Sequence, residues 1–188
     1  MSFLSEDQVK NIGFKSLGKD VIISDKAVFY RPERMTIGNH VRIDDFCVLA
    51  NNIVLHDYVH IALKSSILSS ANAVVEMEDY TGLGYHSLIF TMSDDFSRGA
   101  FINPTMPDEF RCLTEKSVHV RKFGCIGAGA VVLPGADIGE GTTVGAMSLV
   151  IQSTKPWMCY FGNPARPMLK RNEKLKELEK TFLERYSV

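Results

Sequence analysis

The sequence lacks the features that mark several common classes of protein. No stretch approaches the roughly 20 apolar residues that a membrane-spanning helix needs, and residues 1–14 carry early acidic side chains with no apolar core, so we expect neither a membrane span nor a signal peptide. The four cysteines form no CxxC pair, which excludes a zinc ribbon. We therefore expect a reduced, cytoplasmic protein in which Cys47 and Cys125 are small core residues.

An excess of charge of one sign is also missing. The chain of 188 residues has 21 Lys and Arg against 22 Asp and Glu, so it has no cationic surplus with which to coat a nucleic acid. Hydrophobic residues make up 45% of the sequence and 11 residues are Phe, which excludes a disordered chain. The length suits one domain with a small appendage.

A six-residue period of aliphatic residues dominates the sequence. One run extends from Ile37 to Ile67, and after a slip the register resumes from Met77 to Ile89. A third run extends from Val120 to Val150. Small residues usually follow four positions after the later anchors: Ser65, Ala71, Thr81, Ser87, Gly124, Ala130, Ala136, Thr142 and Ser148.

This period excludes the ordinary helix and the ordinary half-buried strand. A helix requires apolar residues three and four apart, and a half-buried strand requires alternation. A period of six predicts short strands joined by tight turns, three to a coil, with coils stacked at about 4.8 Å into a three-sided column. A β-sandwich is the alternative, but sandwiches do not hold a six-residue register over consecutive units.

Breaks in the period mark the other elements. We expect a short helix over Glu6–Leu17, where Ser5 and Gln8 have the spacing of a capping box. The long break at 91–117 predicts an ordered, Phe-rich loop. The tail Asn172–Tyr186 places Leu175, Leu178, Phe182 and Tyr186 on one face of a helix, which we expect to cover the last coil or a partner. The predicted division is a repeat domain over 1–170 and a C-terminal helix over 171–188.

The repeats resemble those of the hexapeptide-repeat acyltransferases. The resemblance covers about Ile37–Val150 and the segment that follows. It implies a mainly β fold, a left-handed parallel β-helix with an inserted loop and a C-terminal α-helix. It also implies a homotrimer, acetyl-CoA as the acyl donor, no metal, and active sites between subunits that the loop of one chain reaches.

The catalytic residues depart from the best-known branch of this family, the galactoside and maltose O-acetyltransferases. Where their loop begins with Thr-Gly-His, this sequence has Met92-Ser93-Asp94 and then Asp95. Imidazole is a suitable general base near neutral pH. We expect His60 to be that base, with Asp94 or Asp95 orienting its second nitrogen, and His86 to be the second candidate. The remaining three histidines, interpreted as solvated turn residues, are His40, His56 and His119.

The segment after the last repeat resembles the family's coenzyme A segment, a Thr-Lys pair followed by proline and a Gly-x-Pro-[AC]-Arg turn. The resemblance assigns nucleotide contacts to Thr154, Lys155 and Arg166, with Lys170 and Arg171 as further cations. Clustered Lys and Arg suit the phosphates of coenzyme A. The small residues that the resemblance assigns to the pantetheine arm are Ala128, Gly129 and Ala146. We expect Trp157 to pack on the last coil rather than cover the adenine.

The function that we favour from the sequence is acetylation of a sugar hydroxyl in polysaccharide biosynthesis. N-acetylation of an amino sugar carried on a nucleotide is the alternative, because an amine is already nucleophilic and needs a base less. A carbonic-anhydrase-like zinc enzyme would use His56, His60 and His86, and an inactive scaffold is a further hypothesis.

Overall fold

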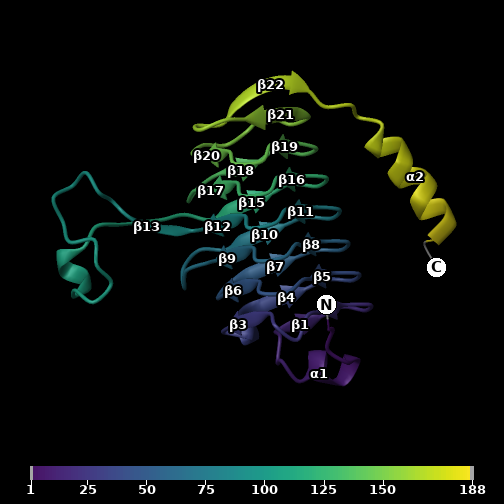
Figure 1. Cartoon of the computed structure of the whole chain (residues 1–188), viewed down its shortest axis with the longest axis horizontal. Helices are drawn as coiled ribbons and strands as arrows, with labels where there is room; N and C mark the ends of the chain where they lie inside the picture. Colours follow the sequence, from purple (N-terminus) through teal and green to yellow (C-terminus); the bar gives the residue numbers. More distant parts are fainter. Residues whose placement is uncertain (1, 187–188) are drawn as a thin grey trace.

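The computed structural model describes residues 2–186 as a parallel β-solenoid of about 7 turns with three faces (Figure 1). The first sheet contains β1 (Ser16–Leu17), β4 (Met35–Ile37), β7 (Ile53–Leu55), β10 (Val75–Met77), β15 (Val118–Val120) and β18 (Asp137–Ile138). The second contains β2 (Ile22–Ile23), β5 (Arg42–Ile43), β8 (His60–Ile61), β11 (Gly82–Leu83), β16 (Cys125–Ile126), β19 (Thr143–Val144), β21 (Met158–Phe161) and β22 (Arg166–Lys170). The third contains β3 (Val28–Tyr30), β6 (Val48–Ala50), β9 (Ser66–Leu68), β12 (Leu88–Phe90), β17 (Val131–Val132) and β20 (Leu149–Val150).

The predicted anchors form the core of the column. From Ile37 through Val150 every anchor side chain is at most 2% exposed. Parallel pairing stacks the anchors of successive coils, as Leu55 on Met77 and Ile61 on Leu83 illustrate. The six-residue prediction is therefore confirmed, and burial of these side chains stabilises the stack by removing their apolar surface from water.

The small residues between the anchors also point inward. Eight of the nine are buried, and Ala71 is the exposed exception. Their hydroxyls bond across coils: Ser65 Oγ donates to the Gly84 carbonyl at 2.6 Å, and Ser87 Oγ donates to the Gly127 carbonyl at 2.7 Å. A buried hydroxyl is tolerated at these positions because it is hydrogen-bonded.

Two sequence predictions need correction at the level of single elements. The first helix, α1 (Glu6–Lys10), has the predicted capping box but ends at Lys10 rather than Leu17, which lies in β1. Gly13, with a φ of 84°, lies in the connection between them. Cys125 is exposed, because it occupies the outward position of β16 beside the buried anchor Ile126, whereas Cys47 is buried as expected.

The break at 91–117 forms an arm that projects from the column (Figure 1). It leaves the third sheet after β12 as β13 (Met92–Asp94), and returns to the first sheet through β14 (Leu113–Glu115), which pairs antiparallel with β13. A short 3-10 helix, η2 (Asp108–Phe110), lies within it, and η1 (Pro32–Arg34) is a similar turn earlier in the chain. We call the edge of the column from which the arm projects the loop corner.

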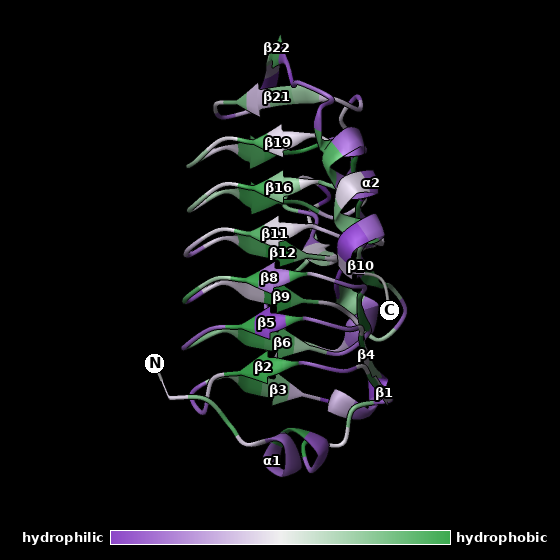
Figure 2. Ribbon diagram, turned by 90° about the vertical axis from the view of Figure 1, so that its right-hand side faces the viewer, coloured by the Kyte–Doolittle hydropathy of each residue, from purple (hydrophilic) through white to green (hydrophobic). Residues whose placement is uncertain are grey.

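The C-terminal helix α2 (Leu175–Tyr186) runs down the side of the column (Figure 2). Of the two expected docking surfaces, the last coil or a partner, the first is therefore wrong. The helix packs on a stack of aromatic rings at the turns between the first and second sheets, formed by His40, Tyr58, Tyr80, Phe123 and Trp157. Phe182 meets Tyr58 edge-on, with ring centroids 5.3 Å apart. We call this edge the helix corner. The last coil is covered instead by β22, which pairs antiparallel with β21.

Candidate active site

The turns between the second and third sheets form an edge at which the upper coils carry mainly Gly and Ala, and we call it the bare corner. Larger side chains are also exposed at this edge, among them Phe46, Tyr85 and Met147. A Cβ on Gly84 would lie 2.8 Å from the nitrogen of Ala128, and one on Gly127 would lie 2.7 Å from the nitrogen of Ala146. Contacts this close to backbone atoms admit only glycine. Successive coils therefore expose backbone along this edge, and the predicted pantetheine residues Ala128 and Ala146 lie on it.

The candidate base His86 lies at the same corner. Its φ is 57°, it is exposed, and the next coil places Gly129 above it, where the Gly129 amide donates to the Tyr85 carbonyl at 2.8 Å. Met147 lies above Gly129, so that a Cβ on Gly129 would come within 2.5 Å of the Met147 sulfur. The structure thus brings His86, Ala128, Gly129 and Ala146 together.

The predicted phosphate-binding residues divide between two corners. Arg166 begins β22 opposite Phe161, whose ring lies directly over Gly145, so this exposed cation stands at the upper end of the bare corner. Lys170 ends β22 opposite Met158, at the other end of the same strand. Only Arg166 of this pair is positioned beside the small residues.

The remaining three residues of that prediction have structural contacts. Thr154 Oγ1 accepts from the Gly139 amide at 2.9 Å, and the Lys155 carbonyl accepts from Thr142 Oγ1 while the Lys155 side chain stays exposed. Arg171 Nη1 donates to the carbonyls of Phe123 at 2.7 Å and Gly141 at 2.9 Å. These bonds tie Arg171 to the helix corner, which does not favour the predicted phosphate contact.

Asp94 is the last residue of β13, at the outer end of the β13–β14 ribbon, and Asp95 follows it. The two carboxylates have different surroundings. Asp94 Oδ1 accepts from Arg111 Nη2 at 3.0 Å and from Nε at 3.3 Å. Asp95 Oδ1 accepts from the Ser97 hydroxyl and amide, and these bonds hold the pKa of Asp95 below its usual range. The Asp95 carboxylate therefore belongs to a local turn, and Asp94 is the better candidate for contact with a substrate.

The expected pairing of His60 with Asp94 or Asp95 is wrong. His60 lies on the outer face of the second sheet, and its Nε2 bonds to Asp44 Oδ2 at 2.9 Å. Arg42 Nε donates to the other oxygen of Asp44 at 2.8 Å. Burial opposes the ionisation of Asp44, but the hydrogen bonds from Arg42 and His60 outweigh it and lower its pKa. A coil of 18 residues stacks Arg42 on His60, so this signal was present in the sequence.

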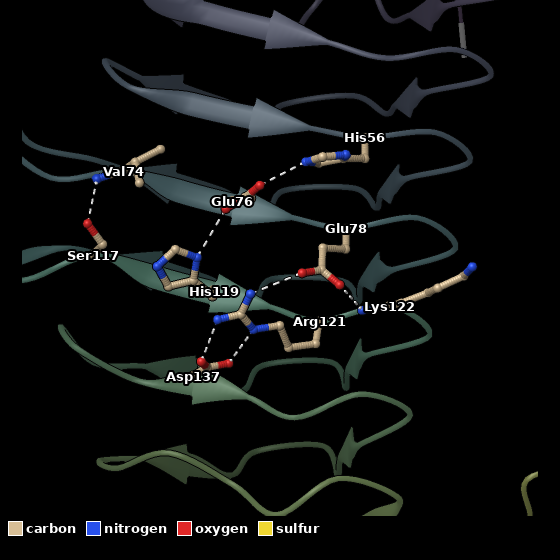
Figure 3. A network of polar contacts seen from close by, with 9 residues as sticks. All are labelled: His56, Val74, Glu76, Glu78, Ser117, His119, Arg121, Lys122 and Asp137. Carbon is tan, nitrogen blue, oxygen red and sulfur yellow. Dashed lines mark hydrogen bonds and ion pairs between the residues drawn. The ribbon is translucent and has the colours of Figure 1, made fainter.

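The outer face of the first sheet carries a polar network that the sequence analysis missed (Figure 3). Glu76 bonds to His56 Nε2 at 2.9 Å and to His119 Nδ1 at 3.2 Å, and these bonds lower the pKa of Glu76. His56, His60 and His86 lie on different faces or corners, and within residues 2–186 no three His, Cys, Asp or Glu side chains converge as metal ligands. The zinc-enzyme hypothesis thus finds no support in the geometry.

A solenoid with a bare corner, a projecting arm and a cationic end hairpin defines the class of hexapeptide-repeat acyltransferases. No family model matches the chain. It is 40% identical over 185 residues to the dTDP-4-amino-4,6-dideoxy-D-glucose acyltransferase of Escherichia coli, covering 97% of this chain and 95% of that protein. It is also 29% identical to a putative lipopolysaccharide biosynthesis O-acetyl transferase, WbbJ, of the same species, over 89% of this chain and 93% of WbbJ.

Solved structures agree. A mutant of AntD, an N-acyltransferase from Bacillus cereus, in complex with dTDP-4-amino-4,6-dideoxyglucose and coenzyme A, superposes with a TM-score of 0.95 at 39% identity, covering 97% of each chain. AntD with dTDP and 3-hydroxybutyryl-CoA gives a TM-score of 0.96 at 38% identity, over 100% of this chain and 99% of that one.

The chain therefore belongs to the hexapeptide-repeat acyltransferases, in the family that contains the Escherichia coli enzyme. It is an acyltransferase. Within residues 2–186, no helix has both the length and the apolar character required to cross a membrane.

Proposed function

We propose that the protein transfers a short acyl group, acetyl or a close relative, from coenzyme A to the amino group of a dTDP-linked 4-amino-4,6-dideoxyhexose in the cytoplasm. The observation that carries this proposal is the near-complete match to AntD, whose crystal structure holds both an amino-sugar nucleotide and coenzyme A. The match favours N-acylation, the alternative in the sequence analysis, over acylation of a hydroxyl. The absence of Thr-Gly-His agrees, because an amine needs less activation than a hydroxyl.

A trimer is part of the proposal, and the outer face of the third sheet supports it. Two columns of outward side chains run up this face, and most of them are apolar. They are Val28, Val48, Ser66, Leu88, Val131 and Leu149 in one column, and Tyr30, Ala50, Leu68 and Phe90 in the other. An apolar strip of this kind on a soluble protein marks a surface that another chain covers.

In a trimer whose three subunits turn their third sheets toward a common axis, two different corners of neighbouring subunits meet. The third sheet is bounded by the bare corner on one side and the loop corner on the other. In any three-fold arrangement of this kind, the loop corner of each chain lies beside the bare corner of its neighbour. The arm carries exposed apolar residues for such a contact, among them Phe96, Phe101 and Phe110.

The proposed site therefore combines Asp94 of one chain with His86, Gly129 and Ala146 of the partner subunit. The thioester would lie along the bare corner, beside the small residues Ala128, Gly129 and Ala146. The amine nitrogen attacks the thioester carbonyl carbon, the new C–N bond forms, and the C–S bond breaks to release coenzyme A. Asp94 accepts the proton that the nitrogen loses and passes it to the leaving sulfur or to water. His60 has no part in this step.

The proposal is tested by offering the enzyme acetyl-CoA with two acceptors that differ only at C4 of the sugar. One is dTDP-4-amino-4,6-dideoxyglucose, and the other is dTDP-6-deoxyglucose, which has a hydroxyl there. Mass spectrometry should show acyl transfer to the amine with at most trace transfer to the hydroxyl. Equal or preferred transfer to the hydroxyl sugar would overturn N-acylation, and binding of neither coenzyme A nor nucleotide would favour the scaffold hypothesis.

A further inference from the structure

Arg111 is one of the most enclosed charged side chains of the projecting arm. It follows η2 directly and precedes β14, and its side chain is only 8% exposed. The backbone amide of Arg111 donates to the Asp108 carbonyl at 3.0 Å, and Arg111 forms an isolated parallel β-bridge with Phe101. Backbone and side chain are therefore fixed just beyond the outer end of the β13–β14 ribbon.

The guanidinium of Arg111 is directed at one oxygen of Asp94. Both Nη2, at 3.0 Å, and Nε, at 3.3 Å, donate to Asp94 Oδ1. Within residues 2–186, Asp94 Oδ2 accepts no hydrogen bond. The Asp94 side chain is itself 16% exposed, so its orientation is restricted while one oxygen is left for another partner.

The contact of Arg111 with Asp108 is different in kind. The distance from Nη1 to Asp108 Oδ1 is 3.5 Å, and the Asp108 side chain is 91% exposed. A contact this long to a solvent-exposed carboxylate contributes little. Of these two contacts, the enclosed one with Asp94 is therefore expected to fix the position of the Arg111 guanidinium.

We propose that Arg111 is a positioning residue for acyl transfer, which holds Asp94 so that Oδ2 faces the amine of the acceptor. The inference rests on the proposed function, because it requires Asp94 to take the proton. The planar fork of Arg can place two N–H groups on one carboxylate, whereas Lys offers a single point of charge. Misplacing a reacting group by about 1 Å can cost on the order of 100-fold in rate.

The test compares Arg111→Gln and Arg111→Lys in the wild-type and Asp94→Asn backgrounds, with Asp108→Asn as the control. We expect Arg111→Gln to lower kcat by about 10–100-fold, with KM for acetyl-CoA within about threefold, and Arg111→Lys to recover part of that loss. In the Asp94→Asn background, Arg111→Gln should change kcat by less than about twofold, because residues that act as a unit are not additive. Asp108→Asn should stay near wild type.

Three results would overturn the inference. The first is a wild-type kcat for both Arg111 variants, and the second is an equal loss from Arg111→Gln with and without Asp94. The third is a wild-type kcat for Asp94→Asn, which would remove the role of Asp94 while N-acylation of the amino sugar still stood. Thermal unfolding of each variant separates loss of fold from loss of rate, since a purely structural role would lower Tm without the dependence on Asp94. Failure of wild-type enzyme to acylate the amine would instead refute the proposed function itself.

Discussion

The backbone of Ala146 passes so close to Gly127 that a Cβ on Gly127 would lie 2.7 Å from the Ala146 nitrogen and 2.6 Å from the Val144 carbonyl oxygen. Gly127→Ala should therefore separate two coils at the bare corner. We expect a loss of roughly 1–3 kcal/mol in the free energy of unfolding, the usual cost of overpacking, and a raised KM for acetyl-CoA. Thermal unfolding and steady-state kinetics measure the two effects.

Gly82→Ala is the matched control for that substitution. Gly82 lies in β11 of the second sheet, and the nearest atom to a Cβ there is the His60 carbonyl oxygen at 3.9 Å, an ordinary contact. The Gly82→Ala variant should have the stability of wild type and the same KM for acetyl-CoA. If Gly127→Ala and Gly82→Ala have the same stability and the same KM for acetyl-CoA, the close approach of coils at the bare corner contributes to neither.

Asp94→Asn and Asp95→Asn should differ in their effect on turnover. A general base contributes about 100- to 10,000-fold in rate, so we expect Asp94→Asn to lose at least about 100-fold in kcat. Asp95 stabilises the turn at Ser97 and Arg98, so Asp95→Asn should cost less than about tenfold. Steady-state kinetics with the amino-sugar nucleotide measures both, and a larger loss from Asp95→Asn would reverse the assignment.

Asp137 should contribute a pH-dependent part of the stability. Hydrogen bonds from Arg121, at 2.9 and 2.7 Å, hold the pKa of Asp137 below its ordinary value of 3.8. A carboxyl with a depressed folded-state pKa stabilises the fold above its unfolded pKa, and that stability is lost as pH falls through the folded value. Asp137→Asn should therefore lose less stability than wild type between about pH 5 and pH 3. Denaturant unfolding at several pH values measures this.

The control for that series is Asp7→Asn. The Asp7 side chain is 91% exposed and lies 3.7 Å from Lys10, a surface pair expected to contribute little. The free energy of unfolding of Asp7→Asn should fall with pH in the acid range as that of wild type does. An Asp137→Asn curve parallel to wild type would mean that the contact with Arg121 does not contribute to acid stability.

The helix corner offers a stability prediction independent of catalysis. Phe182 contacts the rings of Tyr58 and Tyr80 edge-on, and Glu179 bonds to Lys122 at 2.6 Å. Phe182→Ala should cost about 1–3 kcal/mol, less than for a fully buried ring. Leu183→Ala, at a position 42% exposed, should cost much less. Equal Tm values for the two variants would show that α2 does not dock through Phe182.

The column could be predicted from the sequence because its core obeys one local rule. Anchors such as Ile61 and Leu83 recur at fixed spacing, and stacked coils bury them whatever lies outside. The small residues of the bare corner follow from the same register. A coil of 18 residues also places Arg42 beside His60, so the contact of His60 with Asp44 was accessible from the same rule.

The arm and the terminal helix could not be predicted in the same way. Residues 91–117 have no period, so the pairing of β13 with β14 and the contact of Arg111 with Asp94 depend on tertiary packing. Of the apolar face predicted for α2, Leu175 and Phe182 are partly buried, whereas Leu178 and Tyr186 are exposed. The surface on which α2 docks is made of aromatic turn residues far apart in the sequence, such as Tyr58 and Phe123. Amphipathicity predicts that a face is covered and does not identify what covers it.

Complementation between two inactive variants tests the shared site most directly. Asp94→Asn removes the proposed base, and Gly129→Trp fills the bare corner, so each protein alone should be inactive. If one chain supplies Asp94 and its neighbour the bare corner, co-refolded equimolar mixtures should recover about a quarter of wild-type acylation of dTDP-4-amino-4,6-dideoxyglucose, since about one site in four combines two native halves. Mixtures as inactive as either parent, although mixed oligomers form, would contradict a site built from two subunits.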